Sequence, residues 1–298
     1  MAPHPSAHLG PLVATYSIVA RDPATNDLGV AVASKFLAVG AYVPAARAGV
    51  GAVATQAHVN TTYGQRALEL MERGATPDDC VAAFREGDES FDVRQVGIVA
   101  ANGASASHTG SACHAWAGGV TGPNFAAQGN ILTGPEVVDA LVSVMADDTL
   151  PFPERLVAAL AAAEEAGGDR RGRQSASLLV VGEAKGYAGL TDRWIDLRVD
   201  DHHAPVEELK RILALHRLFL DKPSRPPREL SDDDVLSLQA ILQRHGYLDR
   251  APTGAWDDAT QNALEALFGV ENLEERWHRG PRIDPVAWEH IQKNLGGD

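Results

Sequence analysis

Apolar residues in the N-terminal part of the chain form short runs broken by turn residues, a pattern typical of β-strands. Two such runs span Thr15–Asp22 and Leu28–Phe36, and the intervening Pro23–Asp27 has turn composition, so the pair predicts a β-hairpin. Further strands are predicted at Val50–Gln56, Val93–Ala100, Ser105–Thr109, Ala115–Val120, Ser175–Val181 and Trp194–Val199.

Helical spacing of apolar residues appears between these runs. The predicted helices span Gly64–Arg73, Thr76–Glu86, Gly134–Asp147, Pro153–Ala166 and Pro205–Leu220. Thr76 is the expected N-cap of its helix, with Pro77 at the first helical position. Hairpins and clustered helices favour an α+β fold over a parallel, doubly wound sheet.

A change in composition at residues 221–229, DKPSRPPRE, predicts a linker between two domains. The first domain is expected at residues 15–220, after a flexible lead or propeptide at residues 1–14. The second, at residues 230–298, is expected to be small and all-helical. Its first helix has Ser231 as N-cap, Gly246 after its end, and apolar residues at helical spacing between them.

Charge and cysteine content narrow the classes of function. Lys and Arg total 26 against 40 Asp and Glu, a net charge of −14 that argues against nucleic acid as a partner. Two cysteines, Cys80 and Cys113, cannot build a disulfide-rich scaffold or a four-sulfur metal site. No apolar run is long enough for a membrane helix, and the lead has no Lys or Arg, so we expect a soluble cytoplasmic protein.

The first hairpin carries candidate catalytic residues. If Asp22 faces Leu28 across a five-residue loop, Thr15 faces Lys35, and Ser17 lies on the same face of the sheet. A Lys ammonium beside a Thr hydroxyl favours the alkoxide and is a known way to activate a weak nucleophile. A slip of one residue would instead pair Thr15 with Ser34 and remove this argument. An ordinary strand edge with a solvated Lys is the alternative.

From Thr15 to about Leu220 the chain resembles an uncharacterised bacterial and archaeal family grouped with the Ntn (N-terminal nucleophile) hydrolases. The residues that carry the resemblance are TYSIVARDP (15–23), LGVAVASKF (28–36), GVGAVATQ (49–56), GNILTGPEVV (129–138), GGDRRGRQSASLLVV (167–181) and DLRVDDH (196–202).

This resemblance implies a four-layer αββα sandwich with a nucleophile at the start of the first strand. Thr15 would be that nucleophile, its free α-amine the general base, and Lys35 the cation that tunes the pKa. The backbone N–H of Thr55 or Gln56 would donate to an oxyanion. Here, however, fourteen residues precede Thr15. Either the Ala14–Thr15 bond is cut or translation starts later, or the site uses another base, or the fold has lost the chemistry.

Other candidate sites are weaker. Asn130 is expected in a Gly-flanked turn, where its side chain could hold an oxyanion or a substrate amide. Arg173, with two neighbouring arginines, could clamp a substrate carboxylate, or could lie in a solvated loop or a subunit contact. Asp200–His203 has the residue types of a metal site but not the spacing, so we expect no metal and no cofactor. Cys113 is expected to be structural.

The C-terminal part, from about Leu230 to Asn294, resembles small three-helix peptidoglycan-binding-like domains. The matching residues are Leu238, Gln239, Leu242, Gly246, Tyr247, Gly254, Thr260 and Ala263. The usual Gln after the last aromatic residue is absent, because Gly269 follows Phe268. A peptidoglycan fragment is therefore a candidate partner, although the expected cytoplasmic location conflicts with it. A docking or oligomerisation element, or a lid, is the alternative.

Together these observations favour an Ntn-type amidohydrolase that cleaves a small amide or ureide with Thr15 as nucleophile. Lys35 and Ser17 would assist catalysis, while Thr55, Gln56, Asn130 and Arg173 would bind the oxyanion or the substrate. The alternative is a non-catalytic Ntn-fold scaffold whose C-terminal module binds a partner or a cell-wall fragment. A Ser17- or Cys113-based hydrolase is a third, weaker hypothesis. We expect a homo-oligomer without a nucleic-acid or membrane partner.

Overall fold

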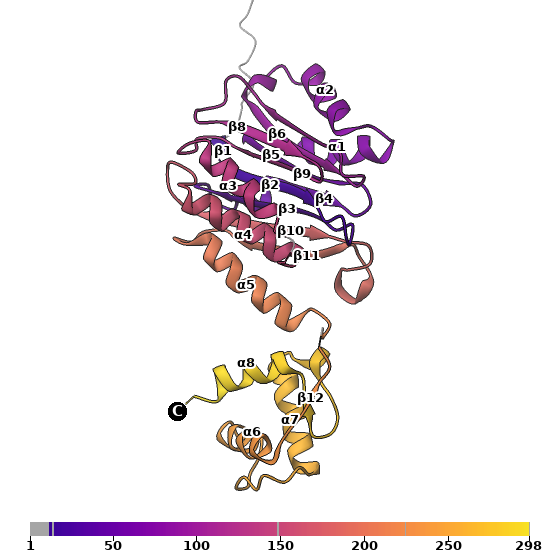
Figure 1. Ribbon diagram of the computed structural model, residues 1–298, viewed down its shortest axis with the longest axis vertical. Helices are drawn as coiled ribbons and strands as arrows, with labels where there is room; N and C mark the ends of the chain where they lie inside the picture. The colour runs from indigo at the N-terminus through magenta and orange to yellow at the C-terminus, as the bar shows by residue number, and fades with distance from the viewer. Residues whose placement is uncertain (1–11, 14, 148, 224, 298) are drawn as a thin grey trace, which may run out of the picture. The chain divides into compact units, whose positions relative to one another are not determined.

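The computed structural model describes residues 12–13, 15–147, 149–223 and 225–297. Of the predicted lead, residues 1–11 and 14 lie outside the described part. Contacts divide the chain into two compact units, Met1–Leu213 and Ala214–Asp298, each of which is described by itself (Figure 1). The division falls within helix α5 (Pro205–Phe219).

The first unit contains a six-stranded antiparallel sheet, which we call the hairpin sheet. Its strand order is β11-β10-β3-β2-β9-β8. The strands are β2 (Thr15–Arg21), β3 (Leu28–Ser34), β8 (Gly118–Gly122), β9 (Phe125–Gly129), β10 (Ser175–Val181) and β11 (Arg193–Val199). The predicted hairpin therefore forms the centre of this sheet.

A second antiparallel sheet, which we call the facing sheet, has the order β1-β5-β6-β7, with β4 also paired to β5. Its strands are β1 (Leu12–Val13), β4 (Pro44–Arg47), β5 (Gly51–His58), β6 (Arg94–Ala100) and β7 (Ser105–Thr109). Val13 pairs with Ala57 in this sheet, whereas Thr15 begins the central strand of the other sheet. Val13 and Thr15, two positions apart, thus belong to different sheets.

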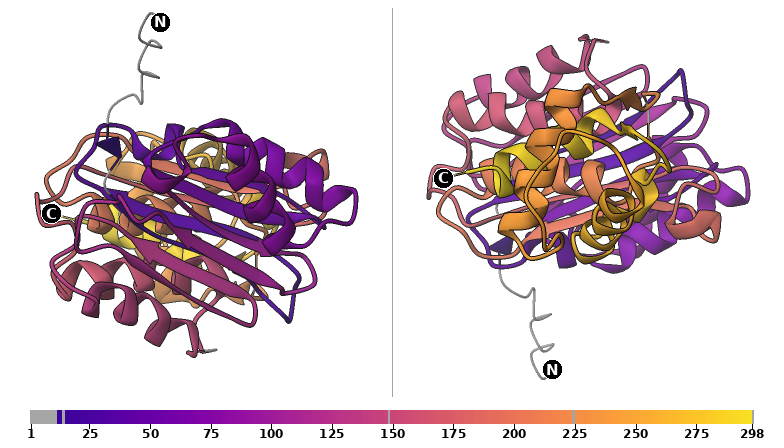
Figure 2. Two further views of the ribbon diagram at one scale, coloured as in Figure 1. Left: turned by 90° about the horizontal axis from the view of Figure 1, so that it is seen from above. Right: turned by 90° about the horizontal axis from the view of Figure 1, so that it is seen from below.

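Helices cover the outer faces of the two sheets, as the purple and pink helices in Figure 2 show. α1 (Thr62–Glu72) and α2 (Pro77–Gly87) pack on the facing sheet, while α3 (Glu136–Met145) and α4 (Phe152–Glu165) pack on the hairpin sheet. A third apolar core, which includes Val19, Val30 and Val99, fills the space between the sheets. The prediction of a mixed fold built on antiparallel strands is confirmed.

Local capping signals are realised as predicted. The Thr76 hydroxyl accepts from the N–H of Asp79, whose carboxylate accepts from the N–H of Thr76, and Pro77 opens α2. No helix within the described residues combines the length and apolarity that spanning a bilayer requires.

The predicted hairpin register is wrong by one residue. Thr15 pairs with Ser34, and Arg21 with Leu28. The reason lies in the turn, where Asn26 takes a left-handed conformation (φ 64°) and the N–H of Asp22 donates to the carbonyl of Asp27 at 2.8 Å. The loop therefore has four residues instead of five, and Lys35 falls just beyond the end of β3.

Strand β9 was not predicted. Its sequence is rich in Ala and has no β-branched residue. The glycine before Asn130, which the sequence places in a turn, is the last residue of β9 and pairs with β2. Asn130 directly follows this strand, and its N–H donates to the carbonyl of Thr15 at 3.0 Å. The short strands β1 and β4 were also missed.

The second unit contains α6 (Asp232–Arg244), α7 (Asp258–Val270) and α8 (Pro285–Leu295). Ser231 caps α6, and Gly246 adopts φ 79° after its end, as predicted. The second unit is not all-helical, contrary to the prediction from the sequence, because β12 (Arg228–Glu229) and β13 (Arg282–Ile283) pair as a two-stranded antiparallel sheet. β12 falls at the end of the predicted linker. The helices enclose a core that includes Leu242, Leu264 and Trp288.

Candidate functional site

A row of hydroxyl side chains crosses the hairpin sheet where β2 begins. Thr15, Ser34 and Ser175 are paired neighbours on β2, β3 and β10, and all three are buried. Because directly paired residues project to the same face, this row shares the inner face with Ser17. The hydroxyl of Thr15 donates to the carbonyl of Val13 at 2.9 Å, and its oxygen lies 3.3 Å from Oγ of Ser34.

A fully buried network of side-chain amides joins the two sheets beside this row. Ser17 Oγ donates to Oε1 of Gln56 at 2.6 Å and accepts from Nε2 of Gln128 at 2.7 Å. Nε2 of Gln56 and Nδ2 of Asn130 both donate to Oε1 of Gln95, each at 2.8 Å. The network thus links β2, β5, β6 and β9 by strong, water-excluded hydrogen bonds.

Two atoms of this network are buried without a hydrogen-bond partner among the described residues, namely Oε1 of Gln128 and Oδ1 of Asn130. Gln128 packs against the backbone of Gly97, where a Cβ atom would lie 2.0 Å from Oε1. Unpaired buried acceptors cost free energy, so they are uncommon in folded proteins. Asn130 is also joined to Thr15 through its backbone N–H.

Lys35 and Arg173 lie away from this network. Lys35 follows Ser34, so its side chain leaves the inner face, and its Nζ donates to the carbonyl of Arg173 at 3.3 Å. Its N–H donates to the carboxylate of Asp169. The predicted pairing of Thr15 with Lys35 is therefore wrong, because the turn shifts the register and brings Ser34 into that place.

The remaining candidates have structural partners. Thr55 donates its N–H to the carbonyl of Val43 at 3.1 Å, so that N–H is occupied in this conformation. Burial raises the pKa of the Cys113 thiol, which makes it a poor nucleophile. His202 accepts the N–H of Ala204 at the start of α5 through Nδ1. Within the described residues, no group of three or more His, Cys, Asp or Glu forms a metal-binding cluster.

Several residues of the site were not predicted, above all Ser34, Gln95 and Gln128. A signal for the two glutamines exists in the sequence, since each is a lone amide in a strand of small and apolar residues. A polar residue in such a run indicates a buried hydrogen-bonded group. Which groups meet, however, depends on the packing of the two sheets.

Comparisons with known proteins agree with this division of the chain. Residues 15–209 match the family described as "Family of unknown function (DUF1028)", and residues 218–290 match the family described as "Putative peptidoglycan binding domain". The crystal structure of a DUF1028 protein from Silicibacter pomeroyi is similar at a TM-score of 0.63 and 31% identity. The match covers 68% of this chain and 89% of that one. No curated protein matched the chain.

Proposed function

This chain belongs to the DUF1028 family, for which no function is known, and we propose that its first unit is an Ntn-type amide hydrolase with Thr15 as nucleophile. The proposal rests on the position of Thr15. This residue begins the central strand β2 and projects between the two sheets, next to the hydroxyl of Ser34 and to the buried amide network. Two antiparallel sheets with helices on both outer faces support the Ntn-type layering.

In the uncut chain the nitrogen of Thr15 is an amide and cannot act as a base. We infer that the hydroxyl of Thr15 attacks the carbonyl carbon of residue 14, so that the acyl group moves from nitrogen to oxygen. Water then hydrolyses this ester, which frees the Thr15 amine and a carboxylate at residue 14. Val13, which now accepts the hydroxyl proton of Thr15, would leave with the lead.

In the cut enzyme, the free amine would take the proton of the Thr15 hydroxyl as the oxygen attacks a substrate amide. The same proton would pass to the leaving amine, and water would hydrolyse the acyl-enzyme. The side-chain amide of Asn130 is the candidate donor to the oxyanion, because within the described residues only one of its two N–H groups is used, by Gln95. The backbone N–H of Asn130 holds this residue beside Thr15 by donating to the Thr15 carbonyl. Ser34 takes the neighbouring position that the sequence assigned to Lys35.

Intact mass of the purified full chain over time tests this proposal. We expect a product that begins at Thr15, and a reactive amide mimic that labels Thr15 in that product. Thr15→Ala should remain full length and unlabelled, while Thr121→Ala, at an exposed strand position, should behave like the wild type. A full-length wild-type protein that turns over an amide substrate would falsify the role of the free amine.

A second candidate function rests on the match of residues 218–290 to a peptidoglycan-binding family. We infer that the second unit binds a peptidoglycan fragment, whether or not the first unit is catalytic. The full-length Thr15→Ala protein should then sediment with insoluble peptidoglycan and not with cellulose. If the protein stays in the supernatant with both polymers, the binding function is wrong.

A further inference from the structure

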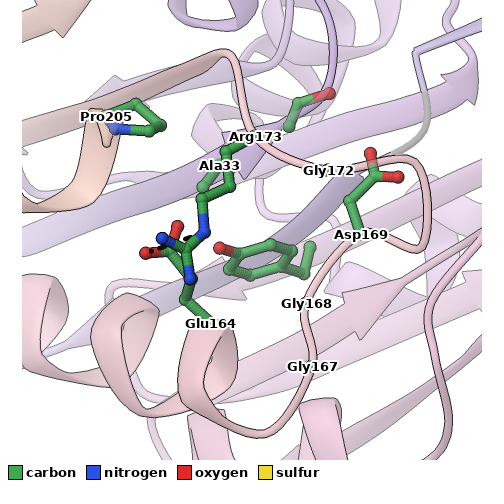
Figure 3. Close-up of a pocket in the computed structure, with 10 residues that line it drawn as sticks. Ala33, Glu164, Gly167, Gly168, Asp169, Gly172, Arg173 and Pro205 are labelled. Carbon is green, nitrogen blue, oxygen red and sulfur yellow. Dashed lines mark ion pairs between the residues drawn. The ribbon is translucent and has the colours of Figure 1, made fainter. Parts of the chain in front are cut away.

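A small cavity lies on the outer side of the hairpin sheet at the end of β3, and the last two residues of that strand, Ala33 and Ser34, belong to its lining. Its volume is about 80 Å³, and it is enclosed by Tyr16, Glu164, the loop 167–173 and Pro205 (Figure 3). Tyr16 follows Thr15 in β2, so its side chain projects to the opposite face from the proposed nucleophile. The cavity therefore takes Tyr16 from the face opposite the Thr15 hydroxyl, and of the hydroxyl row only Ser34 belongs to its lining.

Glu164 presents an unused acceptor in this cavity. Its side chain is only 11% exposed, and Oε2 is buried without a hydrogen-bond partner among the described residues. The other oxygen, Oε1, lies 3.4 Å from Nε of Arg173. Burial and the nearby carboxylate of Glu207 raise the pKa of Glu164, although Arg173 and a hydrogen bond from Tyr16 oppose the rise. A cationic donor at Oε2 would stabilise the ionised carboxylate and offset the free-energy cost of burying it.

Arg173 supplies the complementary charge. Its side chain is 52% exposed, and Figure 3 shows its guanidinium beside the carboxylate of Glu164 at the cavity. The other acid of the cavity, Asp169, is already engaged by the N–H of Lys35 and by Arg171. Glu164 and Arg173 are thus the two charged groups of the cavity with capacity for a ligand.

We propose that this cavity binds a small zwitterion whose ammonium group donates to Oε2 of Glu164 and whose carboxylate accepts from the guanidinium of Arg173. The volume has room for only a few non-hydrogen atoms, so the ligand class is a free α-amino acid of the size of glycine or alanine. A simple anion is disfavoured because Glu164 and Glu207 both repel it. A simple amine leaves Arg173 without a new partner.

Titration calorimetry of the full chain with glycine tests the proposal, with acetate, methylammonium and acetamide as comparison ligands. We expect saturable glycine binding at millimolar concentrations, and at least about tenfold weaker binding of each comparison ligand, because each lacks one or both charges. Glu164→Gln and Arg173→Gln should each weaken glycine binding by at least about tenfold. The matched controls, Glu165→Gln on the exposed side of α4 and Arg170→Gln in the same loop, should bind as the wild type does.

Three results would overturn the proposal. The first is the absence of saturable glycine binding to the wild type, and the second is acetamide or acetate binding as tightly as glycine. The third is unchanged affinity in Arg173→Gln, whose half-exposed side chain allows substitution without loss of the fold, as circular dichroism would verify. Binding is measured without turnover, so failure here leaves the proposed role of Thr15 untouched.

Discussion

The hydroxyl oxygens of Thr15 and Ser34 lie 3.3 Å apart across a directly paired position of β2 and β3. The proton of the Thr15 hydroxyl is directed to the carbonyl of Val13. In this conformation Oγ of Ser34 is a second acceptor for the Thr15 hydroxyl. Once Thr15 gives up its proton, the Ser34 hydroxyl can instead donate to the Thr15 oxygen and stabilise the negative charge on it. Lys35, one residue later, is turned to the other side of the sheet.

This relationship predicts that two neighbouring substitutions change the cleavage rate by different amounts. Ser34→Ala should slow cleavage at the Ala14–Thr15 bond by about tenfold or more, because the Thr15 oxygen loses the neighbouring hydroxyl, 3.3 Å away, that can stabilise its developing charge. Lys35→Ala should change the rate by less than about threefold, as expected of an exposed side chain outside the site. Intact mass at successive times measures both rates. A larger effect of Lys35→Ala than of Ser34→Ala would contradict the assignment.

The contact between Gly97 and Gln128 predicts a measurable energetic coupling. Gly97→Ala should lower the free energy of unfolding by about 1–3 kcal/mol, because the new Cβ collides with the Gln128 amide. Adding Gln128→Ala should cost less in the Gly97→Ala background than in the wild type, with a coupling of about 1 kcal/mol or more. Denaturant titration of the four proteins gives the cycle.

Gly269→Ala is the matched control for that series. Gly269 lies in α7 with open space around its Cβ position, so alanine should leave stability unchanged or raise it by about 0.5–1 kcal/mol. Purely additive effects of Gly97→Ala and Gln128→Ala on the free energy of unfolding would show that the packing of the Gln128 side chain does not require glycine at position 97.

The raised pKa of Glu164 predicts the sign of a pH effect on stability. Above the ordinary glutamate pKa of about 4.3, the folded state holds its proton more tightly than the unfolded state, so this group makes stability fall as pH rises. Glu164→Gln removes that slope. The variant should therefore gain stability relative to the wild type as the pH rises above the ordinary glutamate pKa of about 4.3.

Thermal unfolding at a series of pH values measures this difference. Glu165→Gln, an exposed neighbour on the same helix, should leave the slope unchanged. A gap between Glu164→Gln and wild type that shrinks as the pH rises would contradict the raised pKa. Saturating glycine should reduce the gap, because an ammonium group on Glu164 favours the charged carboxylate.

Asp88 predicts the reverse dependence. Burial by itself would raise its pKa, but hydrogen bonds from Arg94, Tyr63 and Asn60 outweigh it and hold the pKa well below the ordinary value. Its stabilisation is therefore complete above the ordinary aspartate pKa and is lost as the pH falls. Asp88→Asn should cost about 3 kcal/mol at neutral pH, because it leaves the largely buried Arg94 without its anion.

Chemical denaturation at neutral and acidic pH checks this prediction. The difference between Asp88→Asn and wild type should shrink as the pH falls below about 4, where protonation begins to remove the charge of Asp88 in the unfolded state. Glu89→Gln is the control, since its side chain is exposed. A cost that stays constant with pH would mean that the charge of Asp88 contributes nothing.

The sequence by itself determined the elements and their local chemistry. Runs of apolar residues predicted the central strands, helical spacing predicted the helices, and Thr76 and Ser231 predicted two helix starts that form as expected. These features depend on residues within a few positions of one another, so the local pattern carries them. The local pattern does not predict β9, because its Ala and Gly residues have little strand preference. This strand is stabilised by pairing with β2 and β8.

Only the tertiary structure decided which side chains share a site. One left-handed residue, Asn26, sets the loop length, and that length decides whether Thr15 faces Ser34 or Lys35. Side chains alternate between the faces of a strand, so a shift of one residue moves a group to the opposite side of the sheet. The meeting of Ser17, Gln56 and Gln128 depends on two sheets packing face to face, and residues far apart in sequence make that contact only in the folded chain.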